Sequence, residues 1–306
     1  MVLRYDVKVL IIGNEGYIGS YLIEYLQSKN LEVVGYGNRE NDYNNLTEDY
    51  LKEFTHIVLL AGHSSVKMCD GDLFSPWYNN VVNFKNLLNK KPHETKLIYA
   101  SSASVYGNSN LKIFDETDIS LDFVNNYDLT KVSLDLYALQ QIGYGQEIVG
   151  LRFGTVNGGS KIIRKDLMIN SMVFNAITDG KIYISNKEVN RPILSIKDLA
   201  SSIERIITNW VFWPGIYNLA SFNSNVMDIS NAVKDILGVD IIDRGDFPGV
   251  YNFNISTNKF KNEYDFDFIE TIESVVDDVV SCYSQSPKIV SRDTYFKYDR
   301  LPDSNI

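Results

Sequence analysis

The sequence predicts an α/β fold, namely a Rossmann-type doubly wound parallel sheet with a smaller C-terminal substrate-binding domain. Short apolar segments rich in β-branched residues alternate with segments whose apolar residues recur at helical spacing. A glycine-rich turn directly follows the first apolar segment. Alternating strands and helices form βαβ units with right-handed connections, and such units build a parallel sheet.

The first half of the chain contains most of the regular alternation. Residues 7–12 are apolar apart from Lys8, which is typical of a strand buried on both faces. Residues 17–28 carry apolar side chains at helical spacing and predict a helix. The sequence further predicts strands over 32–36, 56–61 and 97–100 and a helix around 81–89.

The second half alternates less regularly. It predicts, in order, a strand over 148–153, a helix over 166–178, a strand followed by a helix within 193–207, a strand over 216–219 and helices over 228–237 and 271–283. Asp198 is the expected start of the second of these helical segments, and Gly238 favours the end of the helix over 228–237 because glycine readily forms a C-terminal cap. From Ser284 onward the chain is polar and contains two prolines, which predicts a loosely attached tail.

Composition narrows the class of protein. The 306 residues are 44% hydrophobic and 22% charged, as in an ordinary soluble globular protein. The net charge of −10 argues against a nucleic-acid partner, and no apolar run reaches the ~18 residues needed to cross a membrane. The N-terminus lacks the features of a signal peptide, so we expect a cytoplasmic protein with Cys69 and Cys282 reduced. No Cys/His cluster has metal-binding spacing.

The glycine-rich turn is the first candidate binding site. It has the sequence Gly13-Asn14-Glu15-Gly16-Tyr17-Ile18-Gly19. The first glycine permits a tight turn, the second lets the backbone approach a pyrophosphate, and the third allows close helix–strand packing. Because the turn follows a buried strand and opens a helix, it predicts dinucleotide binding at a helix N-terminus. We expect Gly13, Gly16, Tyr17, Ile18 and Gly19 to contact the cofactor.

The end of the second predicted strand bears on the choice between NAD and NADP. An acidic residue there favours NAD, because it binds the adenosine ribose. This chain has Gly37 at that position, and Arg39 is able to bind the 2′-phosphate of NADP. We expect NAD(P), with NADP slightly favoured over NAD, and with Asn38 and Arg39 among the cofactor contacts. The alternative is that Arg39 is a solvated charge and Glu40 binds the ribose.

Tyr127 and Lys131 form the second candidate site. At i and i+4 they lie on one face of a helix. A free tyrosine has a pKa near ~10, too high for efficient proton transfer at neutral pH. A nearby ammonium lowers that pKa by stabilising the phenolate. The hydroxyl-rich segment 101–104 follows another buried strand, so its side chains are expected at the carboxyl edge of the sheet, where ligands bind.

Together these motifs resemble the extended short-chain dehydrogenase/reductase family of nucleotide-sugar epimerases, dehydratases and reductases. The resemblance covers roughly residues 7–285. Its motifs appear in family order: the glycine turn, Leu60-Ala61-Gly62-His63-Ser64-Ser65-Val66, Asn80-Val81, the serine segment, Tyr127 with Lys131, Leu151-Arg152-Phe153 with Gly158, Arg191-Pro192 with Asp198, and Tyr217-Asn218-Leu219.

The resemblance implies roles for individual residues. Ser102, which precedes Gly107 by five residues, is the hydroxyl that polarises the reacting oxygen. Tyr127 is the acid/base, and Lys131 lowers its pKa and binds the nicotinamide ribose. Asn80 supports the helix that carries the site, and Ser101 and Ser104 supply supporting hydroxyls. The further implied cofactor contacts are Ala61 and Gly62, together with Tyr127 and Lys131.

The resemblance also implies a nucleotide-diphosphate sugar as the substrate. Its expected contacts are Ser64, Ser104, Thr155, Arg164, Asn170 and Arg191. The family often has an asparagine where this chain has Thr155, which leaves the nucleotide open. His63 lies near the expected sugar site, where a substrate contact and a structural role both remain open.

The implied organisation has two parts. Residues 1–155 and about 192–215 form an NAD(P)-binding Rossmann domain, residues about 156–191 and 216–285 form a nucleotide-sugar-binding domain, and 286–306 form the tail. Family members usually dimerise, so we expect a homodimer. Apolar positions around 81–88 and 132–139 are candidates for that interface, although they are equally suited to the core.

Two reactions remain open. Sugar 4,6-dehydratases of the family carry an Asp-Glu pair directly after the catalytic hydroxyl, where this chain has Ala103 and Ser104, so dehydration is not expected. Asp115, Glu116 and Asp118 lie further along and are expected to be solvated. The first hypothesis is a nucleotide-sugar epimerase acting at C4, and the alternative is an NADPH-dependent reductase of a nucleotide-linked 4-keto sugar. A non-catalytic dinucleotide sensor is a minor alternative, because such proteins usually lose the tyrosine or lysine.

Overall fold

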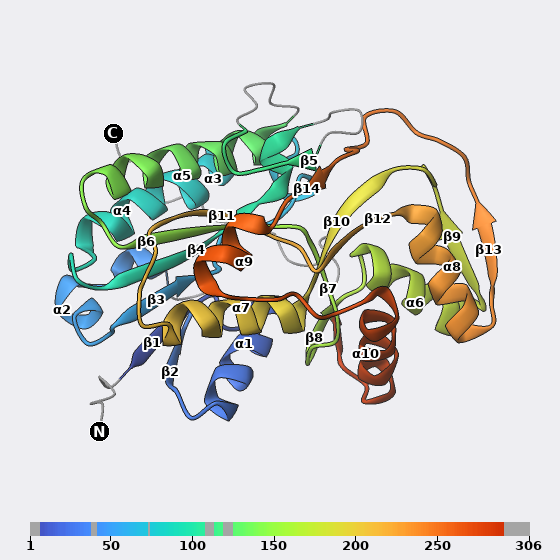
Figure 1. Ribbon diagram of the computed structural model, residues 1–306, viewed down its shortest axis with the longest axis horizontal. Helices are drawn as coiled ribbons and strands as arrows, with labels where there is room; N and C mark the ends of the chain where they lie inside the picture. Colours follow the sequence, from blue (N-terminus) through green and yellow to red (C-terminus); the bar gives the residue numbers. More distant parts are fainter. Residues whose placement is uncertain (1–6, 38–41, 73, 108–112, 119–124, 291–306) are drawn as a thin grey trace.

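A six-stranded parallel sheet organises the larger part of the molecule. The computed structural model describes residues 7–37, 42–72, 74–107, 113–118 and 125–290. Within them the strand order of this sheet is β11-β6-β4-β3-β1-β2. Helices α3, α4 and α5 lie above the sheet in Figure 1, and α1 and α7 lie below it. The predicted doubly wound parallel sheet is therefore confirmed.

The elements of the large sheet and its covering helices have the following bounds. The strands are β1 (Lys8–Ile12), β2 (Glu32–Tyr36), β3 (His56–Leu59), β4 (Lys96–Ser102), β6 (Ile148–Phe153) and β11 (Gly215–Leu219). The helices are α1 (Tyr17–Ser28), α2 (Glu48–Leu51), α3 (Phe74–Trp77), α4 (Asn83–Lys90), α5 (Asn126–Gly143), α7 (Ile196–Thr208) and α9 (Asn258–Tyr264), and a π-helix over Tyr78–Val82 precedes α4.

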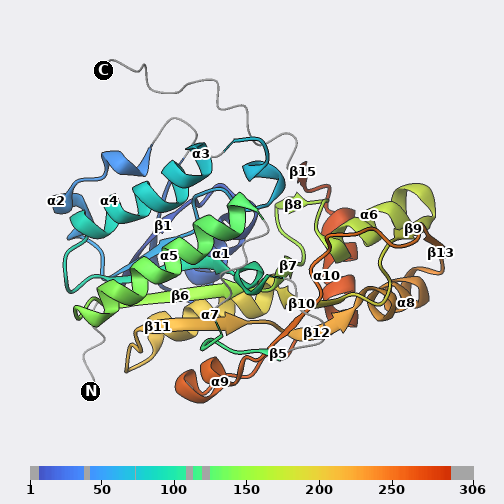
Figure 2. The same cartoon turned by 90° about the horizontal axis from the view of Figure 1, so that it is seen from above.

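The remaining elements gather beyond the carboxyl edge of the sheet. They are β5 (Ile113–Phe114), β7 (Thr155–Asn157), β8 (Ile162–Arg164), α6 (Met168–Asp179), β9 (Lys181–Ile184), β10 (Asn190–Ser195), β12 (Phe222–Asn225), α8 (Val226–Leu237), β13 (Asp240–Asp243), β14 (Asn254–Ile255), α10 (Ile272–Ser284) and β15 (Lys288–Val290). Figures 1 and 2 show α6, α8, α10, β9 and β13 close together at the end of the molecule away from β1 and β2.

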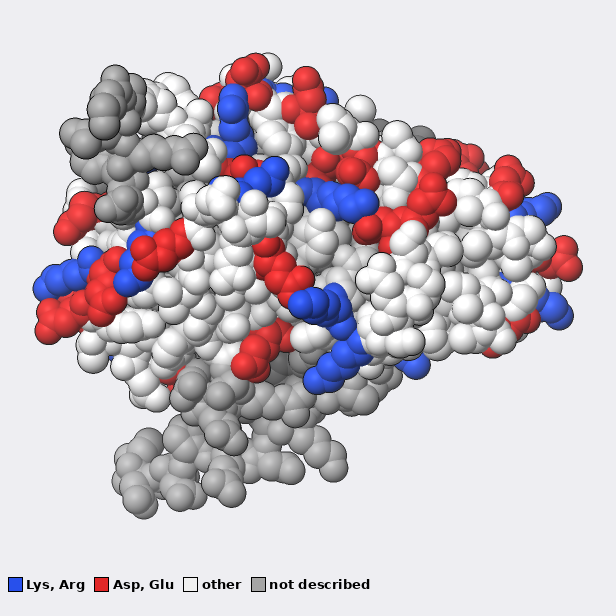
Figure 3. Space-filling model, turned by 90° about the horizontal axis from the view of Figure 1, so that it is seen from below, with Lys and Arg blue, Asp and Glu red and all other residues white. Residues whose placement is uncertain are grey.

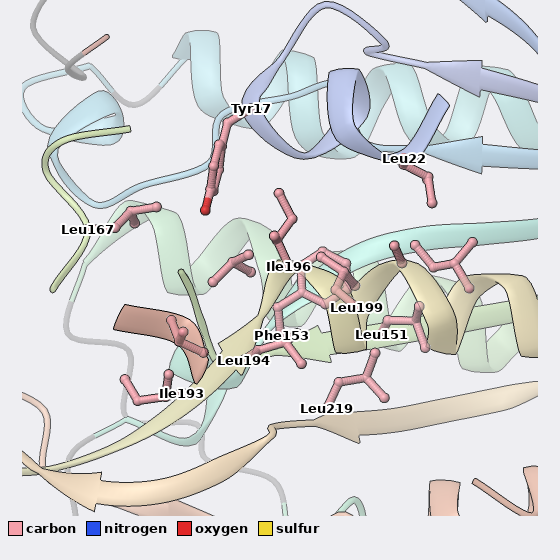
Figure 4. Close-up of a cluster of buried hydrophobic side chains, with 14 of the residues drawn as sticks. Tyr17, Leu22, Leu151, Phe153, Leu167, Ile193, Leu194, Ile196, Leu199 and Leu219 are labelled. Carbon is pink, nitrogen blue, oxygen red and sulfur yellow. The ribbon is translucent and has the colours of Figure 1, made fainter. Parts of the chain in front are cut away.

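The layers are held together by apolar side chains on both faces of the sheet. β1 is buried along almost its whole length, as its apolar sequence predicts. One core cluster lies between the sheet, α1 and α7, where Leu22, Leu151 and Leu199 are fully buried (Figure 4). A second cluster fills the opposite face beneath α4 and α5. Since both faces are covered, ligands have access to the sheet at its edges.

The register of the sheet places the motifs at one edge. β4 pairs in parallel with β6, and Ser102 lies opposite Phe153 at the carboxyl ends of these strands. β1 lies between β2 and β3, so the chain passes from β1 to β2 on one side and then crosses past β1 to reach β3 on the other side. This is the switch point of the sheet, where open α/β folds bind ligands.

Two strands belong to different sheets from those we expected. β11, expected in the smaller domain, pairs with β6 and forms the last strand of the large sheet. β10, expected to return to the large sheet, pairs with β7 in parallel and β12 in antiparallel. Both strands are apolar and buried, so their composition predicts burial without identifying the partner strand.

Two local expectations also need correction. Helix α7 begins at Ile196, and its cap is Ser195, whose hydroxyl accepts the Lys197 amide hydrogen at 3.2 Å. Asp198 instead accepts a hydrogen bond from the Ser221 hydroxyl at 2.6 Å. The expected loose tail is anchored at its start, because β15 pairs in parallel with β8. A three-residue strand between prolines is too short for a clear alternating pattern.

The surface carries mixed charge. On the face in Figure 3, basic side chains lie beside acidic ones without forming one continuous basic surface. None of the described helices is long and apolar enough to cross a membrane. Cys69 and Cys282 are both free thiols.

Candidate active site

The glycine turn joins β1 to α1 in the way its sequence predicts. Helix α1 begins at Tyr17, directly after Gly16. A Cβ at position 19 would lie 2.1 Å from the Gly13 carbonyl oxygen, so only glycine allows this close approach. A Cβ at position 16 would meet nothing closer than 3.4 Å, which leaves room on that side of the turn. The turn therefore fits a pyrophosphate placed against the first amides of α1.

A cavity of about 480 Å³ opens at this edge of the sheet. Its wall includes the five predicted contacts of the glycine turn, the segment 60–66 after β3, the segment 100–104 at the end of β4, and parts of α5, β7, β8 and β10. Ala61 and Gly62 line it, as does Ser101, whose buried hydroxyl has no hydrogen-bond partner among the described residues. A cavity of this size and polarity suits a cofactor and a small-molecule ligand.

Ser102 ends β4 at the wall of this cavity. Its hydroxyl lies 2.9 Å from the Ser104 hydroxyl, and the Ser104 amide donates to the Ser102 oxygen at 3.2 Å. The strand ends in a short turn at this point, and Ser102 and Ser104 both line the cavity. Ser104 therefore contacts the Ser102 hydroxyl, and its expected role as a supporting hydroxyl stays a prediction.

Tyr127 and Lys131 occupy the first two turns of α5 and line the same cavity as Ser102. The Asn125 side chain caps the helix by accepting the Asp128 amide hydrogen at 3.0 Å. The Lys131 ammonium donates to the Ala100 carbonyl at 2.9 Å and lies 5.7 Å from the centre of the Tyr127 ring. Burial lowers the pKa of Lys131 to about 8.

Asn80 supports this arrangement from the π-helix. Its amide nitrogen donates to the Thr130 hydroxyl at 3.0 Å and to the His63 carbonyl at 3.1 Å. Its amide oxygen accepts the His63 backbone hydrogen at 2.8 Å. The predicted support of α5 by Asn80 is confirmed, and the same residue also holds the loop after β3. His63 is buried in that loop and lines the cavity, and burial lowers its pKa.

Five of the six expected substrate contacts line the cavity: Ser64, Ser104, Thr155, Arg164 and Arg191. The Arg164 guanidinium is held by the Asp166 carboxylate at 2.7 Å and 3.2 Å. The Arg191 guanidinium donates to the Tyr251 carbonyl and lies over its ring at 5.9 Å. Burial lowers the pKa of Arg191 to about 10, and the group stays charged at neutral pH.

Asn170 differs from expectation. It is fully buried in α6 and is not part of the cavity wall. Its side chain accepts the Gly158 amide hydrogen at 3.0 Å and donates to the Arg164 carbonyl at 3.0 Å. Its contacts therefore hold the backbone that carries Arg164, instead of facing a ligand. The sequence motif identifies the residue at position 170, but it does not predict which way α6 packs and therefore which groups the side chain contacts.

The positions expected to distinguish NAD from NADP follow β2, and only the first of them, Gly37, lies within the described residues. Gly37 follows β2 with φ of +122°, a conformation that side chains with a Cβ rarely adopt, so a direct replacement by aspartate would strain the turn. Asn38 and Arg39, and the alternative ribose contact Glu40, lie outside the described residues.

Two aromatic residues of the cavity wall, Tyr251 and Phe253, were missed by the sequence analysis. The Tyr251 hydroxyl donates to the Asp128 carboxylate at 2.5 Å, which ties this segment to the start of α5. Both residues lie in an irregular segment more than a hundred residues after Lys131. No spacing in the sequence relates that segment to α5.

Acidic side chains do not contribute to the described wall of the cavity, which instead contains Lys131, Arg164 and Arg191. Glu116, expected to be solvated, is partly buried and accepts the Asn218 amide hydrogen at 2.7 Å. Burial raises the pKa of its carboxyl group. No group of three or more potential metal ligands was found among the described residues.

The fold and cavity define a dinucleotide-binding enzyme of the extended short-chain dehydrogenase/reductase class. The chain belongs to the NAD-dependent epimerase/dehydratase family, whose model matches residues 9–220. This confirms the resemblance found in the sequence, and it identifies an enzyme that uses a nicotinamide dinucleotide. The family acts on nucleotide sugars, as epimerases or dehydratases.

Individual relatives are distant. Protein CapI of Staphylococcus aureus is 26% identical over an alignment that covers 90% of this chain and 98% of the relative. UDP-glucuronate 4-epimerase 2 of Arabidopsis thaliana is 28% identical and covers 51% of this chain and 43% of the relative. A solved UDP-glucuronic acid 4-epimerase from Bacillus cereus, in complex with UDP-glucuronic acid and NAD, superposes with a TM-score of 0.79 at 19% identity. That superposition covers 92% of this chain and all of the other.

Replacing Lys131 by methionine tests the buried ammonium. The folded enzyme loses this proton near pH 8, whereas a lysine in the unfolded chain keeps it to about pH 10.4. The unfolding free energy of the wild type should therefore gain up to about 2 kcal/mol, relative to the variant, between pH 8 and pH 9.5. Urea denaturation across this range measures the difference, and a difference independent of pH would contradict the interpretation.

Proposed function

We propose that this chain is an NAD(P)-dependent nucleotide-sugar epimerase that acts at C4 through Ser102, Tyr127 and Lys131. The observation that carries the proposal is that these three side chains, from β4 and α5, line one cavity with the glycine turn. Family membership supplies the cofactor class and the substrate class. A dinucleotide sensor would not need the three polar groups together at the cavity wall, so it is the weaker hypothesis.

Each side chain has a distinct task in this mechanism. Tyr127 accepts the proton of the sugar C4 hydroxyl and returns it after the face of the sugar has changed. Ser102 hydrogen-bonds the reacting oxygen, and Ser104 fixes the direction of the Ser102 hydroxyl. Lys131 stabilises the phenolate of Tyr127 and binds the cofactor ribose. The nicotinamide, when bound, supplies the hydride acceptor and donor.

The cavity wall argues against dehydration. Removal of water from a 4-keto sugar needs a general acid and a general base beside the catalytic hydroxyl. Ala103 and Ser104 occupy the positions after Ser102, and the described wall contains no carboxylate. Reversible oxidation needs only the three proposed catalytic groups and a retained cofactor.

We propose a UDP-linked hexuronate as the substrate. Arg164 and Arg191 are suited to the diphosphate, because guanidinium groups bind it through several donors. A cavity with cationic and no acidic described residues also accepts the extra carboxylate of a hexuronate. The name of the Arabidopsis relative, a UDP-glucuronate 4-epimerase, points to the same class. Thr155 and Ser64 are the proposed hydroxyl donors to the substrate.

A reductase of a nucleotide-linked 4-keto sugar is the second candidate. Gly37 and the nearby Arg39 favour binding of NADP over NAD. This supports a reductase, because a reductase consumes an exchangeable cofactor such as NADPH. The proposed catalytic side chains are the same for both reactions. The state of the cofactor in the purified protein therefore distinguishes them.

The decisive measurement is mass spectrometry of the nucleotide released from the purified, denatured protein. Stoichiometric NAD is expected for an epimerase that recycles a bound cofactor. Absence of retained cofactor, together with greater thermal protection by NADPH than by NADH, would favour the reductase and contradict the epimerase.

Replacing Tyr127 by phenylalanine should lower the conversion of UDP-glucuronate to its C4 epimer by at least about a hundredfold, because the acid/base is lost. Cofactor binding should be retained. Chromatography of the two UDP-hexuronates measures the rate. Tyr144→Phe is the matched control, since Tyr144 follows the same helix and is exposed. Near-normal turnover by Tyr127→Phe would refute the mechanism, and conversion of UDP-glucose alone would refute the choice of sugar.

We also propose a homodimer. Trp77, Leu136 and Leu139 are between 40% and 47% exposed on α3 and α5, which leaves apolar side chains on the upper layer of Figure 1. Sedimentation velocity should give twice the mass of one chain. A monomer at micromolar concentration would contradict the proposal.

A further inference from the structure

The loop between β7 and β8 joins two short strands beyond the carboxyl edge of the large sheet. Its residues Gly158, Gly159 and Ser160 are held by polar contacts from three helices. The Gly159 amide donates to an Asp278 carboxylate oxygen of α10 at 2.7 Å. The Gly158 amide donates to Asn170 of α6 at 3.0 Å. The third helix is α1, which begins at the glycine turn.

Tyr17 makes the contact from α1. Its hydroxyl donates to the Gly158 carbonyl at 2.8 Å and accepts a longer hydrogen bond from Asn170 at 3.4 Å. Its own carbonyl accepts the Ser160 hydroxyl at 3.1 Å. In Figure 4 the Tyr17 side chain leaves the start of α1 and its hydroxyl points towards the side of the cluster where Leu167 lies. The Tyr17 side chain is almost fully buried.

These contacts continue to a cationic residue of the cavity. Asn170, which holds the Gly158 amide, also donates to the Arg164 carbonyl at 3.0 Å. Arg164 lines the cavity from β8. A short series of buried and partly buried hydrogen bonds therefore runs from Tyr17, through Gly158 and Asn170, to the backbone that carries Arg164.

Tyr17 is at the same time part of the proposed cofactor site. It is the first residue of α1, and it lines the cavity beside Gly16 and Ile18. The free amides of a first helical turn are the groups that bind a pyrophosphate. The backbone of Tyr17 is thus part of the proposed pyrophosphate site, while its hydroxyl binds the β7–β8 loop that leads to Arg164 in the proposed sugar-nucleotide site.

We propose that Tyr17 is a positioning residue that couples cofactor binding to sugar-nucleotide binding. A pyrophosphate on the α1 amides orders the turn that carries Tyr17, and the Tyr17 hydroxyl then orders the β7–β8 loop and the backbone of Arg164. The second ligand meets a site whose ordering has already occurred, so it binds more tightly. Linkage requires each ligand to strengthen the other by the same factor. The inference rests on the proposed function, because it assumes that Arg164 contacts the nucleotide sugar.

Isothermal titration calorimetry of the complete protein measures this factor. NAD and UDP serve as probes, because UDP carries the diphosphate and undergoes no turnover. We expect saturating NAD to tighten UDP binding to the wild type by about fivefold or more. In Tyr17→Phe this factor should fall below about twofold, because a buried hydrogen bond is worth roughly a factor of five in an equilibrium. The variant keeps the ring and therefore the packing of the core.

Tyr25→Phe is the matched control. It removes a hydroxyl from the same helix, one that donates to Glu204 of α7 at 2.6 Å and makes no contact with the β7–β8 loop in the described structure. The control should keep the wild-type factor. Ser160→Ala removes the second contact with Tyr17 and should lower the factor in the same direction. In steady-state assays Tyr17→Phe should raise the KM for the sugar nucleotide more than it lowers kcat.

The outcomes separate the two proposals. A wild-type factor retained by Tyr17→Phe, or an equal loss in Tyr25→Phe, would overturn the coupling role while leaving the proposed function intact. Independent binding of NAD and UDP to the wild type would also overturn it. Failure of the wild type to bind UDP or UDP-glucuronate at all would refute the proposed substrate and, with it, this inference.

Discussion

The ion pair between Arg152 and Asp135 joins the large sheet to the helix that carries Tyr127 and Lys131. Arg152 is on β6 and Asp135 on α5, with 2.7 Å between the guanidinium nitrogen and the carboxylate, and both side chains are buried. The same guanidinium donates to the Tyr106 hydroxyl at 2.8 Å, and that hydroxyl donates to Asn218 of β11 at 2.7 Å. A buried charge is tolerated only with a partner, so these elements are constrained relative to one another.

That constraint bears on the geometry of the proposed catalytic groups. Tyr127 and Lys131 lie on the helix that carries Asp135, and Ser102 lies on the strand next to β6. Their relative position therefore follows from the packing of α5 against the sheet. The pKa of Lys131 is lowered at this position, because burial disfavours the charged form of its side chain. Strongly shifted pKa values of this kind are found at many functional sites.

Charge is distributed unevenly between the surface and the cavity. The chain has a net charge of −10, yet the described cavity wall contains cations and no acidic side chain. A cavity lined by one sign of charge favours ligands of the opposite sign. Because the arginines come from β8 and β10 whereas the lysine comes from α5, this concentration of positive charge exists only when both parts of the molecule are assembled.

Local elements were predictable because their patterns are local. The bounds of α1, β2 and β6 agree with the periodicity of the sequence, since hydrophobic spacing and the glycine turn act within a few residues. The glycine turn, Ser102, Tyr127 and Lys131 were likewise predictable as members of one cavity, because parallel strands bring their carboxyl ends to the same edge.

Long-range partners were decided only by the tertiary structure. β10 pairs with β7, and β11 pairs with β6 in the large sheet. An apolar strand sequence is compatible with either sheet, so composition alone does not identify the partner strand. Asn170 is buried in α6 and hydrogen-bonds the β7–β8 loop instead of facing the cavity. Tyr251 lines the cavity although it belongs to an irregular segment. The sequence by itself determined the fold class and the family, and it supplied the candidate catalytic motif. Three-dimensional packing decided which side chains face the cavity, because those contacts join residues that no local spacing relates.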